Sequence, residues 1–281
     1  ITNIDLNTAK TMPGVLLILT GKDARLEKLG SIRPFAVLRR SDGAKMYVPP
    51  NLPLTEERVV FVGDPIAIVV AEKKSQAVAA MEAIEVDYEE LDSNVKIEHA
   101  LKPTAPLVWP ESGTNECFFW SKGDSRKVKK EIENSDHCVK GIFTIPLAAA
   151  NPIEPRGCIA EYNKGFGNYH LTAPVQSPWK VRQILSTQSL NIPERLLTVS
   201  CPSIGGSFGM KGQTYNEYAV CLWAARKLGR PVKWVASRTE SFMTDDQGRN
   251  VKVEGILSFN NAGKFGGLYV SGLCGLGAYL S

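Results

Sequence analysis

A glycine-rich segment between a short apolar run and a well-patterned helix constrains this chain more than any other stretch. The apolar run falls within residues 196–199, and glycines follow at positions 205, 206, 209 and 212. Glycine has no side chain, so the backbone of such a loop can closely approach whatever lies above it. The order of these features predicts a strand, an open loop and a helix.

The residues after the loop carry the signals of a helix. Thr214 and Glu217 have the spacing of a capping box at its start, and Gly229 followed by Pro231 predicts its end. Apolar side chains between them repeat at helical spacing, and we expect them to form one buried face. These side chains are Tyr215, Tyr218, Ala219, Leu222 and Trp223.

A glycine loop that leads into a helix presents free backbone N–H groups, which often bind an anion such as a phosphate. The spacing here fits neither G-x-G-x-x-G nor G-x-x-x-x-G-K-[ST], so the two common nucleotide motifs have no support. From these residues alone, two interpretations stay open: a tight structural turn, or a loop that binds an anionic cofactor.

Three segments together resemble a known family. They are Gly205-Gly-Ser-Phe-Gly-Met-Lys211, the upstream Thr172-Ala-Pro-Val-Gln-Ser-Pro178, and the downstream segment from Gly229 to Glu240. In this combination the chain resembles the molybdenum-binding large subunit of the xanthine dehydrogenase and aldehyde oxidase family. It is most similar to the branch that includes the aerobic carbon monoxide dehydrogenases, and the resemblance extends along nearly the whole chain.

The resemblance implies an α+β fold with two domains. Residues 1–105 resemble the α/β hammerhead domain of the family, and residues 106–135 predict a linker rich in proline, glycine, serine and charge. Residues 136–281 resemble the N-terminal part of the mixed α+β molybdopterin-binding domain, and residues 260–263 predict a hairpin turn within it. The sequence stops without a terminating signal, so we expect a piece of a longer large subunit.

The resemblance also assigns roles to residues around the glycine loop. Gly205, Gly206 and Gly209 would bring bare backbone to a molybdenum–molybdopterin cofactor, and Phe208 would contact it and project toward the substrate channel. Gln176 matches the family position that donates a hydrogen bond to an oxygen ligand of molybdenum. The dithiolene sulfurs of the cofactor would hold the metal, so no side chain is expected to bind it directly. The residues alone favour a Gln176 that caps the next helix or is solvated.

A Pro-x-Glu-Pro segment supplies one further candidate. Glu154 matches a position near the active-site funnel of the family, which makes it a candidate substrate-pocket residue. It could instead form a surface ion pair with Arg156, worth less than about 1 kcal/mol. Just before this segment the family often has a histidine, where residues 148–150 here are alanines. Purine-oxidising relatives carry a glutamate at the position of Gly212, which argues against a purine substrate.

Members of the family oxidise a substrate carbon, or carbon monoxide, with an oxygen from water. The resemblance therefore implies an aldehyde, an N-heterocycle or a carbon-monoxide-type substrate, and the cytosine dinucleotide form of molybdopterin. Electrons would pass to FAD on a medium subunit and to [2Fe-2S] clusters on a small subunit, and the expected assembly is a homo-oligomer of heterotrimers that includes the remainder of the large subunit. The catalytic glutamate and a substrate-selecting arginine loop would lie beyond Ser281. No catalytic residue is therefore assigned, and the chain alone is expected to be inactive.

Composition argues against several other classes of function. The net charge is only +4 for 281 residues, so nucleic-acid binding has little support. The longest apolar runs have the length of strands, far short of a membrane span, and none follows a basic start typical of a secretion signal. The six cysteines form no C-x-x-C pair for zinc or an iron–sulfur cluster. Scattered thiols are typical of a reducing compartment, so we expect a cytoplasmic protein.

Two alternatives to a molybdenum hydroxylase remain. One is a degenerate paralogue that keeps the fold and acts only as a structural or assembly unit. The other is a phosphate-binding enzyme that uses the loop at 205–212, against which the glycine spacing argues. The three histidines lie far apart and accompany no nucleophile pattern, so the residues favour no hydrolytic site.

Overall fold

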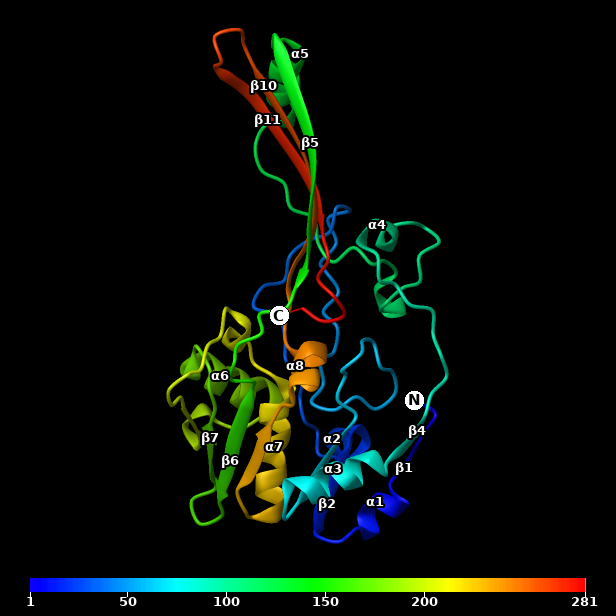
Figure 1. Ribbon diagram of the computed structural model, residues 1–281, viewed down its shortest axis with the longest axis vertical. Coiled ribbons are helices and arrows are strands. Elements are labelled where there is room, and N and C mark those ends of the chain that lie inside the picture. Colours follow the sequence, from blue (N-terminus) through cyan, green and yellow to red (C-terminus); the bar gives the residue numbers. More distant parts are fainter. Residues whose placement is uncertain (281) are drawn as a thin grey trace.

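Four small sheets, rather than one continuous sheet, organise residues 1–280, which are the residues that the computed structural model describes (Figure 1). Two of these sheets have two strands each and lie in the N-terminal third. A four-stranded sheet carries the glycine loop, and a three-stranded sheet extends away from the body as a long arm. The mixture of helices and strands confirms the predicted α+β fold. Within residues 1–280, the helices are too short or too polar to span a bilayer.

The N-terminal part consists of two antiparallel strand pairs covered by short helices. β1 pairs with β4, and β2 pairs with β3. A capping box starts α2, because Thr20 N–H donates to Asp23 Oδ2 at 2.8 Å. The elements are β1 (Asn3–Asp5), α1 (Asn7–Thr11), β2 (Val15–Thr20), α2 (Gly21–Leu26), β3 (Ala67–Ala71), α3 (Lys74–Glu82), β4 (Glu85–Asp87) and α4 (Ile97–Ala100).

The next part of the chain is built on the sheet β8-β7-β6-β9. β7 and β8 run parallel, and the other neighbours are antiparallel. The elements are β6 (Gly157–Asn163), β7 (Asn168–Thr172), α6 (Pro178–Ile184), the π-helix η2 (Leu185–Ser189), the 3-10 turn η3 (Glu194–Leu196), β8 (Leu197–Ser200), the 3-10 turn η4 (Met210–Gly212), α7 (Asn216–Leu228), β9 (Val232–Val235) and α8 (Arg238–Thr244). The predicted strand, loop and helix are therefore present as β8, residues 201–215 and α7.

Helix α7 lies at the centre of the core. Residues 218–225 are all buried, so the helix is enclosed on every side and not only along the predicted apolar face. One side packs against β6 and β9, and another packs against β2 of the N-terminal part. Across the second contact, Trp223 Nε1 donates to Glu27 Oε2 at 2.9 Å. The predicted end is confirmed, with Gly229 in the left-handed region at φ 64°.

The start of α7 differs from the predicted capping box. The helix begins at Asn216, and the Thr214 hydroxyl has no hydrogen-bond partner among residues 1–280. The Glu217 carboxylate, which a capping box would direct to the backbone, pairs with the buried Arg156. The ion pair with Arg156 therefore uses the Glu217 carboxylate that the capping box would need.

A three-stranded antiparallel sheet forms the arm in Figure 1, with the strand order β11-β10-β5. The predicted hairpin turn at 260–263 is confirmed, since it joins β10 to β11 and Gly263 N–H donates to Asn260 O at 2.9 Å. The elements of this region are the 3-10 turn η1 (Pro110–Ser112), α5 (Ser125–Glu133), β5 (His137–Ala148), β10 (Gly248–Phe259) and β11 (Phe265–Cys274).

The segment predicted as a linker, residues 106–135, carries more regular structure than its composition indicates. It contains η1 and α5, and Asp124 Oδ1 caps α5 by accepting from Lys127 N–H at 3.0 Å. Helix α5 then packs against β11 near the tip of the arm. A local cap and a tertiary contact together order this polar stretch.

Candidate functional site

The glycine loop leaves the end of β8, crosses the surface and enters η4. Gly206, Phe208 and Gly209 have positive φ values of 97°, 54° and 101°. Glycine enters this backbone region without strain, whereas it is uncommon for phenylalanine. Phe208 is 80% exposed, so its ring projects from the loop, and Gly205 and Gly209 also lie at the surface. The loop is therefore open and not sealed within packed protein.

Four consecutive backbone N–H groups of this loop are available to a ligand. Within residues 1–280, the N–H groups of residues 206–209 have no hydrogen-bond partner. A β-carbon built on Gly209 would meet no atom within 4 Å, so the space in front of that residue is also free. Consecutive N–H donors on a turn bind anionic or oxo groups. We refer to residues 206–209 as the donor row.

One carboxylate holds the two ends of the loop together. Glu154 Oε2 accepts from Gly205 N–H at 2.8 Å and from Lys211 Nζ at 2.7 Å. The Lys211 side chain is fully buried, and its backbone N–H donates to Ser207 Oγ at 3.1 Å. Burial raises the pKa of Glu154, but the hydrogen bonds from Lys211 and Gly205 outweigh burial and lower that pKa below its ordinary value. Glu154 is therefore an ionised anchor of the loop.

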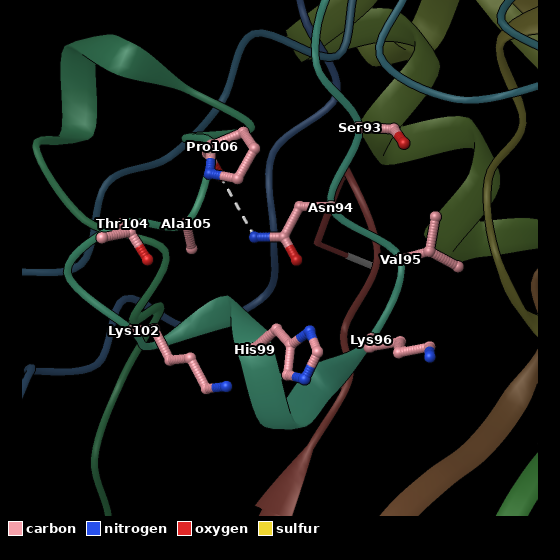
Figure 2. Close-up of a pocket in the computed structure, with 9 residues that line it drawn as sticks. All are labelled: Ser93, Asn94, Val95, Lys96, His99, Lys102, Thr104, Ala105 and Pro106. Carbon is pink, nitrogen blue, oxygen red and sulfur yellow. Dashed lines mark hydrogen bonds between the residues drawn. The ribbon is translucent and has the colours of Figure 1, made fainter.

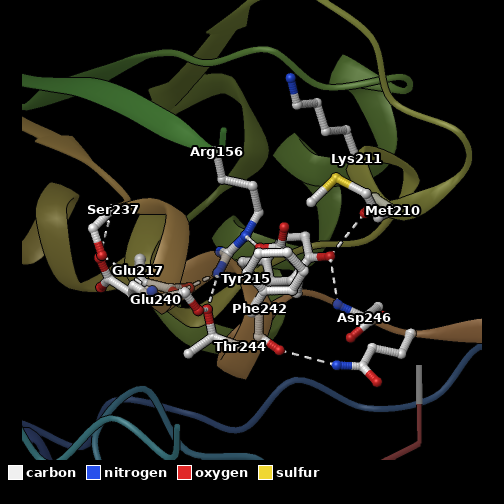
Figure 3. A network of polar contacts seen from close by, with 12 residues as sticks. Arg156, Met210, Lys211, Tyr215, Glu217, Ser237, Glu240, Phe242, Thr244 and Asp246 are labelled. Carbon is white, nitrogen blue, oxygen red and sulfur yellow. Dashed lines mark hydrogen bonds and ion pairs between the residues drawn. The ribbon is translucent and has the colours of Figure 1, made fainter. Parts of the chain in front are cut away.

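The surface ion pair between Glu154 and Arg156, one of the two alternatives for these residues, is not formed. Arg156 is fully buried, whereas the Glu154 side chain is 40% exposed. The Arg156 guanidinium donates to Asp245 Oδ1 at 2.6 Å, to Glu217 Oε1 at 2.9 Å and to Thr244 Oγ1 at 2.7 Å (Figure 3). These partners lie between 61 and 89 residues away along the chain, so the spacing of charges in the sequence gave no signal for them.

The Arg156 cluster supports the end of the loop. Its guanidinium lies over the ring of Tyr215, with 3.7 Å between the central carbon and the ring centroid. The Tyr215 hydroxyl donates to Met210 O at 2.8 Å and accepts from Asp246 N–H at 3.1 Å, as Figure 3 shows. Burial alone would lower the pKa of Arg156, but ion pairing, chiefly with Glu217, raises it above its ordinary value. A permanent buried charge thus fixes the turn that ends the donor row.

Gln176 lies beside the same loop. Its backbone N–H donates to Lys211 O at 3.0 Å, and its side-chain Oε1 would be 2.9 Å from a β-carbon built on Gly212. Gln176 is exposed, and its amide has no hydrogen-bond partner within residues 1–280. The N-cap position of α6 belongs to the next residue, Ser177. The amide of Gln176 is therefore available at the edge of the loop.

Other candidate features lie away from the loop. Residues between Ser93 and Pro106 line a pocket of about 400 Å³ around α4, which contains His99 and no residue of the glycine loop (Figure 2). His137 and His170 lie on β5 and β7. Among residues 1–280, no group of three histidine, cysteine or acidic side chains is arranged to hold a metal ion.

Comparison with known protein families gives two matches that together cover most of the chain. Residues 1–92 match the aldehyde oxidase and xanthine dehydrogenase a/b hammerhead domain, and residues 108–281 match the molybdopterin cofactor-binding domain. The order of the two matches agrees with the resemblance found in the sequence.

Individual relatives match over nearly the whole chain. The carbon monoxide dehydrogenase large chain of Hydrogenophaga pseudoflava is 32% identical over 99% of this chain and 35% of its own length. The nicotine 6-hydroxylase large subunit of Paenarthrobacter nicotinovorans is 28% identical over 99% of this chain and 33% of its own length. The crystal structure of quinoline 2-oxidoreductase from Pseudomonas putida 86 matches 96% of this chain and 33% of that chain, with 28% identity and a TM-score of 0.81. This chain spans about a third of the length of these relatives.

Proposed function

This chain belongs to the aldehyde oxidase and xanthine dehydrogenase family, with a hammerhead domain followed by a molybdopterin cofactor-binding domain, and from that premise we propose that it forms part of the large subunit of a molybdenum hydroxylase. The subunit oxidises an aldehyde, an N-heterocycle or a carbon-monoxide-type substrate with an oxygen from water. The observation that carries this proposal is the donor row at 206–209 with the free amide of Gln176 beside it. We assign residues 1–105 to the hammerhead domain, 106–135 to a linker and 136–281 to the molybdopterin-binding domain.

The residues around the loop fit a molybdopterin. Such a cofactor carries the sulfur ligands of its own metal and, when bound, supplies the redox chemistry, so the protein has to provide N–H donors, amides and space. Gly206, Phe208 and Gly209 provide donors, and Gly209 provides backbone without side-chain bulk in front of free space. The missing side chain of Gly205 instead leaves room for Glu154, which accepts its N–H. The Gln176 amide is placed to donate to an oxygen ligand. Because Glu154 joins the two ends of the loop, the donors and the amide are oriented before the cofactor binds.

Phe208 and Glu154 are the residues that we propose on the substrate side. The exposed Phe208 ring presents an apolar surface beside the donor row. Glu154 Oε1 has no hydrogen-bond partner within residues 1–280, so it can accept from a substrate while Oε2 anchors the loop. A side chain at position 212 would come within 2.9 Å of Gln176 Oε1 and displace that amide. Because purine-oxidising members of the family carry a glutamate at this position, the glycine supports a substrate that is not a purine. The catalytic base is expected from the rest of the subunit.

The proposed whole enzyme is a cytoplasmic homo-oligomer of heterotrimers. It contains the cytosine dinucleotide form of the cofactor on the large subunit, FAD on a medium subunit and [2Fe-2S] clusters on a small subunit. All six cysteines are free thiols, including Cys158 and Cys221, whose side chains are hydrogen-bonded neighbours, and unpaired adjacent thiols support a reducing compartment. The 281-residue chain alone is expected to show no dehydrogenase activity with an artificial electron acceptor.

Two glycines provide a matched test of the proposed cofactor loop. Gly209 and Gly263 have positive φ values of 101° and 76°, and both have open space for a β-carbon. Alanine at either position in the intact subunit therefore carries backbone strain, of about 1–2 kcal/mol in the left-handed region and more at Gly209, whose φ of 101° and ψ of −33° lie outside that region. Only Gly209→Ala changes the loop, so we expect it to lower bound molybdenum and acid-released pterin by roughly fivefold, since about 1 kcal/mol corresponds to that factor. Gly263→Ala should retain both at the wild-type level.

The same measurement separates the alternatives. Equal molybdenum and pterin contents in the two variants would contradict the cofactor role of the loop. A wild-type subunit, assembled with its partners, that contained neither molybdenum nor pterin would favour the degenerate paralogue with a purely structural role.

A further inference from the structure

The register of the arm separates its side chains into two faces of different chemistry. Successive residues of a strand point to opposite faces, and residues paired across antiparallel strands share a face. Phe143 pairs with Val253, which pairs with Gly272, so all three lie on one face. We call this the apolar arm face. Its apolar and small residues are Val139, Gly141, Phe143, Ile145 and Leu147 of β5, Val251, Val253, Gly255 and Leu257 of β10, and Leu268, Val270, Gly272 and Cys274 of β11. By the same pairing, the exposed Arg249 lies beside Leu147 at the base of this face.

The opposite face carries charges and is partly covered. Lys140 and Glu254 pair across β5 and β10 on this face. Near the tip, a β-carbon built on Gly267 would lie 2.9 Å from Val128 O of α5, which places that helix on the charged face. At the base, Lys252 on the same face bonds to Glu98 of α4 at 3.3 Å. Both helices that pack on the arm within residues 1–280 thus cover the charged face.

The apolar arm face remains open to solvent. Phe143 and Leu268 are each 61% exposed, and Val139 and Val270 are each 58% exposed. Strands of this length rise about 3.3 Å per residue and lie about 4.8 Å apart, so the face measures roughly 40 by 14 Å, or about 560 Å². An apolar patch of that size is at the upper end for a monomer and marks an interaction surface. It approaches the roughly 800 Å² that each partner contributes to a stable interface.

We infer that the apolar arm face is the docking surface for the remaining two-thirds of the large subunit. The inference rests on the proposed function, in which this chain forms part of that subunit. The relatives contain about twice as much further polypeptide as the third that this chain matches, so a partner of sufficient size is part of the same subunit. A three-stranded sheet also needs something packed on its hydrophobic face for stability, and no helix of residues 1–280 fills that role.

Adjacent residues of β5 allow a matched test of this surface. Phe143 on the apolar arm face and Ile142 on the charged face are 61% and 63% exposed, so the ammonium of a lysine at either position can reach solvent in the arm itself. In the full-length subunit, Phe143→Lys is expected to lower the yield of assembled enzyme in size-exclusion chromatography by roughly tenfold, the effect of burying one unpaired charge. Ile142→Lys should assemble like the wild type. Equal losses in the two variants would overturn the inference.

Two natural thiols provide a second test, which uses the wild-type enzyme and needs no substitution. Cys274 lies on the apolar arm face and Cys138 on the charged face, and both are exposed in this chain. In the wild-type enzyme, native alkylation with iodoacetamide should modify Cys138, while Cys274 reacts at least roughly tenfold more slowly than in the same enzyme unfolded in urea. Equal reactivity of the two thiols would refute the docking surface. If the protection of Cys274 disappeared on dilution and sedimentation showed dimers, the face would bind a second copy of the chain, which would also refute the inference.

Because neither readout uses molybdenum content or activity, failure of this inference is distinguishable from failure of the proposed function.

Discussion

The pair formed by Glu154 and Lys211 predicts an unequal cost for removing its two members. Within residues 1–280, Lys211 Nζ has one hydrogen-bond partner, Glu154 Oε2 at 2.7 Å, and the lysine side chain is fully buried. Glu154→Ala would therefore leave a buried ammonium without a counter-charge. Lys211→Met instead removes the buried charge, fills most of the same volume, and leaves a carboxylate that is 40% exposed to water and still bonded to Gly205 N–H.

The expected magnitudes follow from this geometry. Removing one partner of a fully buried ion pair costs about 3–5 kcal/mol, whereas an apolar replacement of the charge is often close to neutral. Solvent screening at the Glu154 side reduces the first figure, so we expect about 2–3 kcal/mol for Glu154→Ala and less than about 1 kcal/mol for Lys211→Met. The double variant should then be more stable than Glu154→Ala alone, with a coupling energy of about 2 kcal/mol between the two sites.

Urea unfolding followed by tryptophan fluorescence at 25 °C measures all three variants. The comparison requires that the dependence of the free energy of unfolding on urea concentration is the same in each, so that the midpoints report stability. If Lys211→Met were as destabilising as Glu154→Ala, or if the double variant were the least stable of the three, the buried charge would not be what makes the anchor necessary.

Two further predictions concern the rest of the polar network and the pH dependence of stability. Arg156→Lys should lower the free energy of unfolding by about 2–3 kcal/mol in the same urea assay, because an ammonium cannot bind Asp245 and Glu217 together while lying on the Tyr215 ring, and a loss below about 0.5 kcal/mol would contradict this role. Burial raises the pKa of Asp64 from 3.8 to about 6 against the opposing hydrogen bond from Val60 N–H. The pKa of Asp64 is higher in the folded state than in the unfolded state. Its contribution to the free energy of unfolding is therefore fully present below about pH 4, where the carboxyl is protonated in both states, and is lost as the pH rises through about 6. Asp64→Asn should therefore stabilise the fold by up to about 3 kcal/mol at pH 7 and have no effect below pH 4 in urea titrations, and an unchanged pH profile would refute the assignment.

Local sequence patterns predicted the features that depend on local chemistry. The hairpin at 260–263, the strand and loop before α7 and the end of that helix at Gly229 all follow from short-range signals, and the structure confirms them. The family resemblance, carried by short motifs near the loop, led to the fold and to residues that the structure brings side by side, among them Gln176 and Gly212.

Those local patterns could not predict contacts between residues that lie far apart in the sequence. The spacing of Thr214 and Glu217 predicted a cap, but Arg156, which directly precedes β6, binds the same carboxylate instead, because a buried guanidinium requires counter-charges. Likewise, the sequence left open a weak surface ion pair between Glu154 and Arg156, whereas the fold places Lys211 against the glutamate. The chemistry of each side chain was evident in the sequence, and its partner was set by topology.

The burial of α7 on all sides also affects how the protein unfolds. Trp223 and its neighbours belong to a core that includes Leu19, Ala24 and Leu54 from the N-terminal part as well as residues of the four-stranded sheet. Neither region can lose its structure without exposing a helix on which the other depends, so we expect the two to unfold in one cooperative transition rather than two. We therefore expect a destabilising substitution in the N-terminal part to loosen the glycine loop as well, because both regions pack on the same helix.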